Sequence, residues 1–558
     1  MEALTALSLL IVALLGLFAT PTQQISLPSD PTYNAGVVEF IPAKEGSKKR
    51  LVHDNLGRMK AIIESDATKD LDIIVFPEFV LNNKDMLTYV PDPQDKIIPC
   101  EVANYDWFLT EISCSARSRK LYVVINIAEK AQCSSTVDKK CKDGITNYNT
   151  NVVFDREGRV ISRYRKTHLY RYEWRDTNVM ATPDLATFTT DFGVTFGHFI
   201  CFDMLFYEPA QVLIQHMNIT DIVYPTYWFS ELPFLTAVQL QEGWAFGNNV
   251  NLLAADASNP EGQNTGSGIY AGRLGRLNAV IHEEPNTRVL TAKVPKRNAR
   301  QTYQPPVAFK PVFQPQLESP RFTKLSLLRD YNVDIFSTKL LNETLTHFNE
   351  TLCHNNFCCS FNIERTKMQD SPLHQAYQYR LAAYSGTQTT FQRIDNSNQS
   401  VCALMACTGA ELYTCGHIFP ESVRVANKYY FNAITIVGSF VEAERRLIMP
   451  STVDGVMMPL TVDSYTWREE KRNASTQVQM SLISPQQNLL TFGIWANYYS
   501  SVRNSHNLDA DMMTASTTVS TSPILITTTN AVASTSTVSV SLLVNVLPAV
   551  VLAFLLKY

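Results

Sequence analysis

Between residues 33 and 295, short apolar runs alternate with longer segments of helical pattern, and this alternation constrains the fold most strongly. Such runs are typical of buried strands. They occupy residues 71–79, 121–130, 193–203, 219–228 and 251–257. Helix candidates lie at 51–67 and 232–250, and residues 149–166 predict a hairpin that turns at 155–158. Strands that alternate with helices predict an α/β domain whose helices cover the sheets.

A proline-rich stretch at residues 295–320 separates this region from a second one, and its prolines favour an extended linker. The second region contains apolar runs at 426–444 and 488–500 that are typical of strands. It also holds six cysteines: Cys353, Cys358, Cys359, Cys402, Cys407 and Cys415. A zinc or redox site is the alternative use of these cysteines, but they form no paired C-x2-C set. We therefore expect a disulfide-held, β-rich second domain that ends near residue 505.

The first residues of the chain predict secretion. Residues 3–19 are almost wholly apolar, and small residues follow at a candidate cleavage site, which is typical of a signal peptide. An uncleaved signal anchor is the alternative, although the run is shorter than the ~20 residues that a membrane span needs.

The last residues predict a lipid anchor. A Ser/Thr-rich spacer without charges precedes an apolar tail at 542–556, which is the pattern of a GPI-attachment signal. The expected attachment region contains Asn530, Ala531, Ala533 and Ser534. A transmembrane tail is the alternative, but only Lys557 and Tyr558 follow the apolar run.

Composition agrees with a secreted globular protein. The 558 residues, 45% of them hydrophobic, suit two or three domains, and the net charge of -4 gives no indication of a nucleic-acid partner. Glycosylation sequons lie at Asn218, Asn342, Asn349, Asn398 and Asn473. The total of eleven cysteines is odd, so in an oxidising compartment the remainder predicts a free thiol.

Three polar residues follow apolar strands at comparable places. Glu78 follows the run DIIVFP, Lys166 ends the hairpin, and Cys201 ends the run VTFGHFI. Because ligands of α/β sheets collect at the carboxyl ends of strands, these side chains are placed to converge.

An acid, a lysine and a thiol together suit amide hydrolysis. A lysine within ~4–6 Å lowers the thiol pKa from ~8.5 by ~1–3 units, which predicts a large thiolate fraction. The glutamate takes the thiol proton and returns it to the amine leaving group. Backbone N–H groups after Cys201, with the Lys166 ammonium, hold the oxyanion. The expected reaction proceeds through a thioester.

The order Glu, Lys, Cys with the segments FPEF, YRK and CFD resembles the nitrilase superfamily. The segment CFDMLFYEPA and residues 224–275, which include Trp244, Asn251 and TGSGIY, resemble its vanin and biotinidase branch of secreted amidohydrolases. This resemblance implies an αββα sandwich, a triad of Glu78, Lys166 and Cys201, no metal or other cofactor, and hydrolysis of pantetheine or biotin amides.

The same resemblance suggests supporting residues. Glu173, seven residues after Lys166, is similar in position to a second glutamate that holds the lysine, although the proline that often follows that lysine is missing. Candidates for the oxyanion site or the pocket are Phe202, Tyr227 and Trp228. The expected divisions are a signal peptide (1–22), a nitrilase-like domain (23–305), a C-terminal β-rich domain (306–508), a Ser/Thr-rich stalk (509–531) and a removed GPI signal (532–558).

Each candidate residue also has a non-catalytic interpretation. Cys201 suits a buried structural cysteine, Glu78 and Glu173 suit surface acids, and Lys166 suits a surface charge. A pair of Cys201 with His198 is disfavoured, because residues i and i+3 of a strand point to opposite faces. His168 suits a pocket wall or the surface.

The sequence favours a GPI-anchored pantetheinase on the cell surface, with a small amide as substrate and the membrane as a partner through the lipid. A biotinidase is the first alternative. A glycosylated surface protein that kept the fold without catalysis is the second. Oligomeric state is left open.

Overall fold

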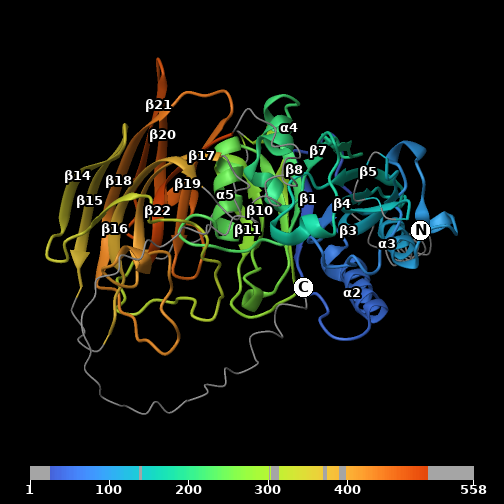
Figure 1. Cartoon of the computed structure of the whole chain (residues 1–558), viewed down its shortest axis with the longest axis horizontal. Coiled ribbons are helices and arrows are strands. Elements are labelled where there is room, and N and C mark those ends of the chain that lie inside the picture. The colour runs from blue at the N-terminus through green and yellow to red at the C-terminus, as the bar shows by residue number, and fades with distance from the viewer. Residues whose placement is uncertain are drawn as a thin grey trace, which may run out of the picture. The chain divides into compact units, whose positions relative to one another are not determined.

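A computed structural model describes residues 25–136, 138, 141, 143–300, 302, 313–368, 374–388 and 397–499. Two six-stranded sheets form the N-terminal part of the fold, drawn in blue to green in Figure 1. The first sheet has the order β12 (Arg288–Pro295), β1 (Thr32–Glu39), β2 (Ile73–Val75), β3 (Tyr122–Gln132), β4 (Ile145–Phe154) and β5 (Val160–Arg165). The second has the order β11 (Arg276–Val280), β10 (Ser267–Ala271), β9 (Asn251–Asp256), β8 (Asp221–Thr226), β7 (Thr195–His198) and β6 (Thr187–Thr189).

The two sheets face each other across an apolar core, and helices cover their outer faces. Val37 and Val124 of the first sheet share this core with Phe196 and Val223 of the second. On the other side of the first sheet, α2 (Lys48–Ile63) and α3 (Trp107–Arg119) bury their apolar stripes. The outer face of the second sheet packs against α4 (Val212–Gln215) and α5 (Ala237–Asn248). The expected αββα sandwich is confirmed.

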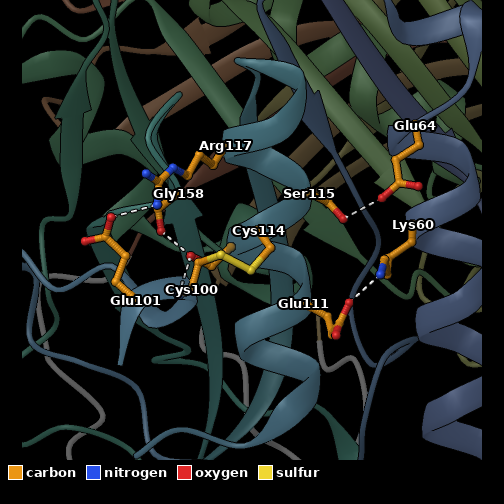
Figure 2. The surroundings of a disulfide bond; sticks show 10 residues. Lys60, Glu64, Cys100, Glu101, Glu111, Cys114, Ser115, Arg117 and Gly158 are labelled. Carbon is orange, nitrogen blue, oxygen red and sulfur yellow. Dashed lines mark hydrogen bonds and ion pairs between the residues drawn. A yellow bond between two sulfur atoms is a disulfide. The ribbon is translucent and has the colours of Figure 1, made fainter. Parts of the chain in front are cut away.

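Helix α3 is fixed to α2 by polar contacts and to the segment before it by a disulfide, as Figure 2 shows. Lys60 of α2 pairs with Glu111 of α3, and Ser115 donates a hydrogen bond to Glu64. The Cys100–Cys114 disulfide ties α3 to the short helix η3 (Pro99–Glu101). These links hold α2, α3 and η3 together as one layer.

The β4–β5 hairpin turns at Asp155–Gly158, as predicted, and this turn leaves no room for a side chain at its glycine. The Gly158 φ angle is 76°, and a Cβ there would lie 2.3 Å from the Ser113 carbonyl oxygen. The Ser113 hydroxyl donates to the Gly158 carbonyl at 2.6 Å, so the turn is fastened to α3. Glycine is the residue that tolerates both the positive φ and the close approach.

The C-terminal part is a sandwich of two five-stranded antiparallel sheets, drawn in yellow to red in Figure 1. One sheet has the order β13 (Ser337–Leu340), β16 (Gln378–Gln388), β17 (Ser397–Cys407), β22 (Leu489–Tyr498) and β19 (Arg446–Asp454). The other has the order β14 (His347–His354), β15 (Phe357–Lys367), β18 (Tyr429–Val441), β21 (Ser475–Leu482) and β20 (Tyr465–Arg472). The Cys359–Cys402 disulfide joins β15 of one sheet to β17 of the other. The predicted disulfide-held β-rich domain is therefore confirmed.

Helix α5 lies between the second sheet and strand β19 of the C-terminal sandwich. A Cβ at Gly243 would lie 2.6 Å from the Pro450 carbonyl oxygen, and one at Gly247 would lie 2.7 Å from that of Ile448. The Gln239 side chain also donates to the Ser451 hydroxyl at 2.9 Å. Two glycines one turn apart let the helix backbone approach the strand. Helix α5 is therefore covered on both sides, and Ala237 to Phe246 are all buried, the polar Gln239, Gln241 and Glu242 included.

The chain after the proline-rich stretch is bound to its surroundings where it is described. Asn427 donates to the Leu317 carbonyl at 2.7 Å, and Phe322 donates to that of Gly455 at 2.7 Å. Leu328 then donates to the Ser230 carbonyl in the α/β domain at 2.9 Å. Residues 303–312 lie outside the described part, as do the predicted signal peptide and the attachment region.

Candidate active site

Glu78, Lys166 and Cys201 lie together at the carboxyl ends of the strands, although they come from both sheets. Glu78 follows β2, Lys166 directly follows β5, and Cys201 begins the short helix η5 (Cys201–Leu205) after β7. Their exposed fractions are 1%, 1% and 4%. A lysine buried to this degree needs compensating negative charge, because burial disfavours an isolated ammonium. None of the three is a surface residue.

Two carboxylates compensate the Lys166 ammonium. Its Nζ lies 2.8 Å from Glu78 Oε1 and 2.8 Å from Glu173 Oε2. Burial alone would lower the pKa of Lys166, but the charges of Glu173 and Glu78 raise it well above its usual value. Burial raises the pKa of Glu173, and the Lys166 charge opposes that shift. Lys166 therefore stays protonated and serves as a fixed positive charge.

Asn149 is a member of this cluster that sequence reasoning missed. Its Nδ2 donates to Glu78 Oε1 at 2.6 Å and to Glu173 Oε1 at 3.2 Å. Asn126 in turn donates to Asn149 Oδ1 at 2.7 Å and accepts from the Phe79 N–H at 3.0 Å. A buried polar residue requires partners, but Asn149 lies among other polar residues of β4, Thr150 and Asn151 included, so no local pattern singles it out.

The nucleophile candidate lies in a sharp turn. Cys201 has a φ angle of 47°, in the left-handed region that costs a non-glycine residue roughly 1–3 kcal/mol. Tyr224 donates its hydroxyl to the Cys201 carbonyl at 2.8 Å, and the Ile200 N–H donates to Asp203 at 3.1 Å. These contacts hold the turn, so that Cys201 lines a pocket and does not continue β7.

The prediction that Lys166 gives Cys201 a large thiolate fraction is wrong. Burial raises the thiol pKa well above its usual value, the Glu78 charge raises it further, and the opposing effect of Lys166 is smaller. A thiolate would add an anion to a buried cluster that already has two carboxylates and one ammonium. The raised pKa makes Cys201 a neutral thiol, which could act as a nucleophile only with a base to remove its proton.

The prediction of one unpaired cysteine is confirmed. The structure contains the disulfides Cys100–Cys114, Cys133–Cys141, Cys353–Cys358, Cys359–Cys402 and Cys407–Cys415. Cys201 alone is free. The disulfides also decide against the zinc or redox interpretation of Cys353, Cys358 and Cys359.

A pocket opens beside Cys201, and aromatic and aliphatic side chains line most of it. Its walls include Tyr170, Phe202, Leu205, Trp228, Phe229 and Leu235. Phe202 and Trp228, two of the three candidates for the oxyanion site or the pocket, lie among these lining residues. Tyr227 is not among the lining residues, but its backbone N–H acts on the Cys201 sulfur and favours the thiolate.

Neither histidine near the candidate residues pairs with the thiol. His198 is fully buried, its Nε2 lies 2.7 Å from the Ser162 hydroxyl, and burial lowers its pKa to about 3. His168 Nδ1 lies 2.9 Å from Asp203, and its ring stacks on Phe206. His198 is therefore a neutral core residue, as the alternation along the strand indicated.

Asp203 joins the lysine segment to the cysteine turn, and sequence reasoning did not single it out. It accepts hydrogen bonds from the Tyr164 hydroxyl at 2.8 Å, from the His168 N–H at 2.8 Å and from the Ile200 N–H at 3.1 Å. Because Tyr164 lies in β5 and Ile200 precedes the cysteine, one carboxylate sets the spacing between the two segments.

Comparison with known proteins agrees with this architecture. Residues 44–246 match the carbon-nitrogen hydrolase family, and residues 325–502 match the vanin C-terminal domain. The chain is 39% identical to vanin-like protein 1 of Drosophila melanogaster over 513 residues, which cover 88% of this chain and 90% of that protein. It is 31% identical to a pantetheinase of Homo sapiens over 419 residues, which cover 72% and 76% of the two chains.

An amidase from Nesterenkonia sp. is a solved structure with 16% identity and a TM-score of 0.36, covering 49% of this chain and 97% of its own. The two matched family models and the extent of the identity to the vanin-like relatives establish the family. The chain belongs to the vanin family of carbon-nitrogen hydrolases and is an enzyme that hydrolyses amide C–N bonds.

Proposed function

We propose that the enzyme hydrolyses pantetheine to pantothenate and cysteamine through a thioester on Cys201. The single observation that carries this proposal is that Cys201, the one free thiol, lines a pocket next to the buried Glu78–Lys166–Glu173 cluster. Relatives named pantetheinase, 29–31% identical over 68–78% of this chain, support the choice of substrate.

Acylation begins with proton transfer from the neutral Cys201 thiol to Glu78. The sulfur attacks the carbonyl carbon of the cysteamine amide, and the Lys166 ammonium with the N–H groups at the start of η5 stabilises the negative oxygen. Glu78 then gives its proton to the amide nitrogen, the C–N bond breaks, and cysteamine leaves. The product is pantothenyl-Cys201 thioester.

Deacylation uses the same residues. Glu78, again unprotonated, takes a proton from a water molecule that attacks the thioester carbonyl. It returns this proton to the Cys201 sulfur as the C–S bond breaks, which releases pantothenate. Asn149 and Glu173 act as positioning residues, because they hold the Glu78 carboxylate and the Lys166 ammonium in place. One carboxylate thus serves both halves of the reaction.

The proposed location is the cell surface, with the chain attached through a GPI anchor in the region of residues 530–534. All five sequon asparagines lie in exposed positions, and five disulfides are formed, both of which support passage through the secretory pathway. None of the helices in the described part of the chain combines the length and apolarity that a membrane crossing needs. Phosphatidylinositol-specific phospholipase C should release the enzyme from cells, and retention would favour a membrane-spanning tail.

The proposed substrate is tested by comparing the turnover of a pantothenyl arylamide with that of a biotinyl arylamide, with Cys201→Ala as the control. We expect the pantothenyl compound to be hydrolysed at least tenfold faster and the variant to be inactive. Preference for the biotinyl compound would identify a biotinidase. Folded wild-type protein that turns over neither compound would contradict the proposed substrate class.

A further inference from the structure

Glu231 contributes the one carboxylate among the residues found to line the pocket beside Cys201. Its side chain is 2% exposed. Glu78 and Glu173 belong to the lysine cluster, and neither contributes to this lining. Glu231 is thus a third acidic group near Cys201, and the proposed chemistry does not use it.

One oxygen of Glu231 lacks a partner. Within the described residues, Oε1 is buried and has no hydrogen-bond partner. Buried polar atoms are nearly always paired in folded proteins, and Glu231 lines the pocket, so we take a ligand atom as the missing partner of this oxygen.

Contacts from two parts of the chain fix the position of Glu231. The Glu231 and Leu235 backbones exchange two hydrogen bonds, of 3.2 and 2.9 Å. The backbone N–H groups of Asp330 and Tyr331 also act on the Glu231 carboxyl group. Leu328, from the same segment as these two residues, lines the pocket. The carboxyl group is therefore held in place before any substrate arrives.

The charge state of Glu231 suits a neutral ligand group. Burial raises its pKa to about 8, the Asp330 charge acts in the same direction, and the backbone N–H groups and Arg171 oppose the shift. At neutral pH the group is mostly a protonated acid, with one O–H donor and one carbonyl acceptor. Such a group pairs with a hydroxyl or an amide.

We propose that Glu231 is a specificity-determining residue that hydrogen-bonds a hydroxyl or amide group in the acyl half of the substrate. This inference rests on the proposed function, because the pantothenyl group offers hydroxyls and an internal amide in an otherwise apolar chain. The aromatic and aliphatic walls take the apolar part, and Glu231 selects the polar part. An acyl chain without such a group leaves the Glu231 oxygen unpaired.

The test compares two substrates in wild-type enzyme and in Glu231→Leu. One substrate is the pantothenyl arylamide, and the other is an arylamide with an unbranched alkanoyl chain of the same length. We expect Glu231→Leu to lower kcat/KM for the pantothenyl compound about 10–100-fold, mainly through KM, which is the range for a lost hydrogen bond to a buried group. The kcat/KM for the alkanoyl compound should change less than threefold.

Two further variants make the test robust. Glu231→Asp shortens the side chain by one methylene and keeps the acid. It should lower the ratio of kcat/KM for the pantothenyl compound to kcat/KM for the alkanoyl compound about 3–10-fold, and it keeps the test valid if the leucine variant does not fold. Glu261→Leu, at an exposed glutamate in η7 (Pro260–Gly262), is the matched control and should leave the ratio unchanged.

The possible failures are distinguishable. An equal loss on both substrates in the Glu231 variants, or an unchanged ratio in both, would overturn the role of Glu231 and leave the proposed function standing. Wild-type enzyme that hydrolyses the alkanoyl but not the pantothenyl compound would overturn the proposed substrate, and this inference with it.

Discussion

Two buried cysteine sites of this enzyme are equally shielded from solvent but differ in what surrounds them. Cys201, 4% exposed, lies beside two carboxylates and an ammonium and remains a thiol. Cys359 and Cys402, both 0% exposed, lie in the apolar core between two sheets and form a disulfide. Burial alone therefore does not make a cysteine reactive. We propose that a base within reach of the thiol makes the difference, and the following predictions address the two sites in order of expected effect.

The largest effect is expected where the base is removed. Glu78→Gln keeps the shape of the side chain but cannot accept the thiol proton, so kcat/KM for the pantothenyl arylamide should fall about 10²–10⁴-fold. Steady-state kinetics measures this loss, and Glu261→Gln is the control at an exposed glutamate. A Glu78→Gln enzyme within tenfold of the wild-type value would show that the cysteine needs no base, and the contrast between the two sites would then disappear.

At the disulfide site the expected effect is on stability and not on chemistry. The double variant Cys359→Ala/Cys402→Ala removes a disulfide between cysteines 43 residues apart. Because this disulfide restricts the unfolded chain, the free energy of unfolding should fall by about 2–5 kcal/mol without it. Turnover at low temperature should stay within threefold of wild type.

Urea unfolding measures the change. Cys353→Ala/Cys358→Ala is the control, because that disulfide closes only five residues and should matter less. A large loss of turnover in the folded Cys359→Ala/Cys402→Ala variant would tie the sandwich core to catalysis.

The smallest expected effect concerns His198, three residues before Cys201, and the pH dependence of the free energy of unfolding. Burial lowers the pKa of His198 to about 3, so the unfolded chain binds more protons than the folded one between that value and ~6.5. The free energy of unfolding therefore rises with pH in this window. Lowering the pH from 7 to 5 should reduce it by about 2 kcal/mol through His198.

Urea unfolding at the two pH values measures this contribution in wild type and in His198→Gln. The variant should lose about 2 kcal/mol less than wild type between pH 7 and pH 5. Equal losses would show that His198 is not held neutral by its surroundings.

Sequence reasoning succeeded where a local pattern determines the outcome. The β4–β5 hairpin and the strand before each candidate residue could be predicted from short segments, and a free thiol from the odd number of cysteines in the chain. Some predicted strands are longer than the observed ones. The run 193–203 forms strand β7 only at Thr195–His198, because the chain turns before Cys201. The strand at 71–79 is likewise shortened to Ile73–Val75. Both runs end in the loops that carry the functional side chains.

Features that depend on distant contacts were not predictable. Asn149 donates a hydrogen bond to Glu78, which is 71 residues away in the sequence, and Leu328 from the start of the second domain lines the pocket. The sign of the Cys201 pKa shift depends on burial outweighing the Lys166 charge, and a list of neighbouring charges does not give burial. The roles of Glu78, Lys166 and Cys201 and the domain limits stay predictions.

The most direct test is to find the acyl group on the enzyme. Wild-type protein mixed with excess pantothenyl arylamide and quenched in acid within milliseconds should carry the mass of one pantothenyl group, and peptide mass spectrometry should place it on Cys201. Absence of that mass during active turnover, or its presence on another residue, would contradict thioester catalysis at Cys201.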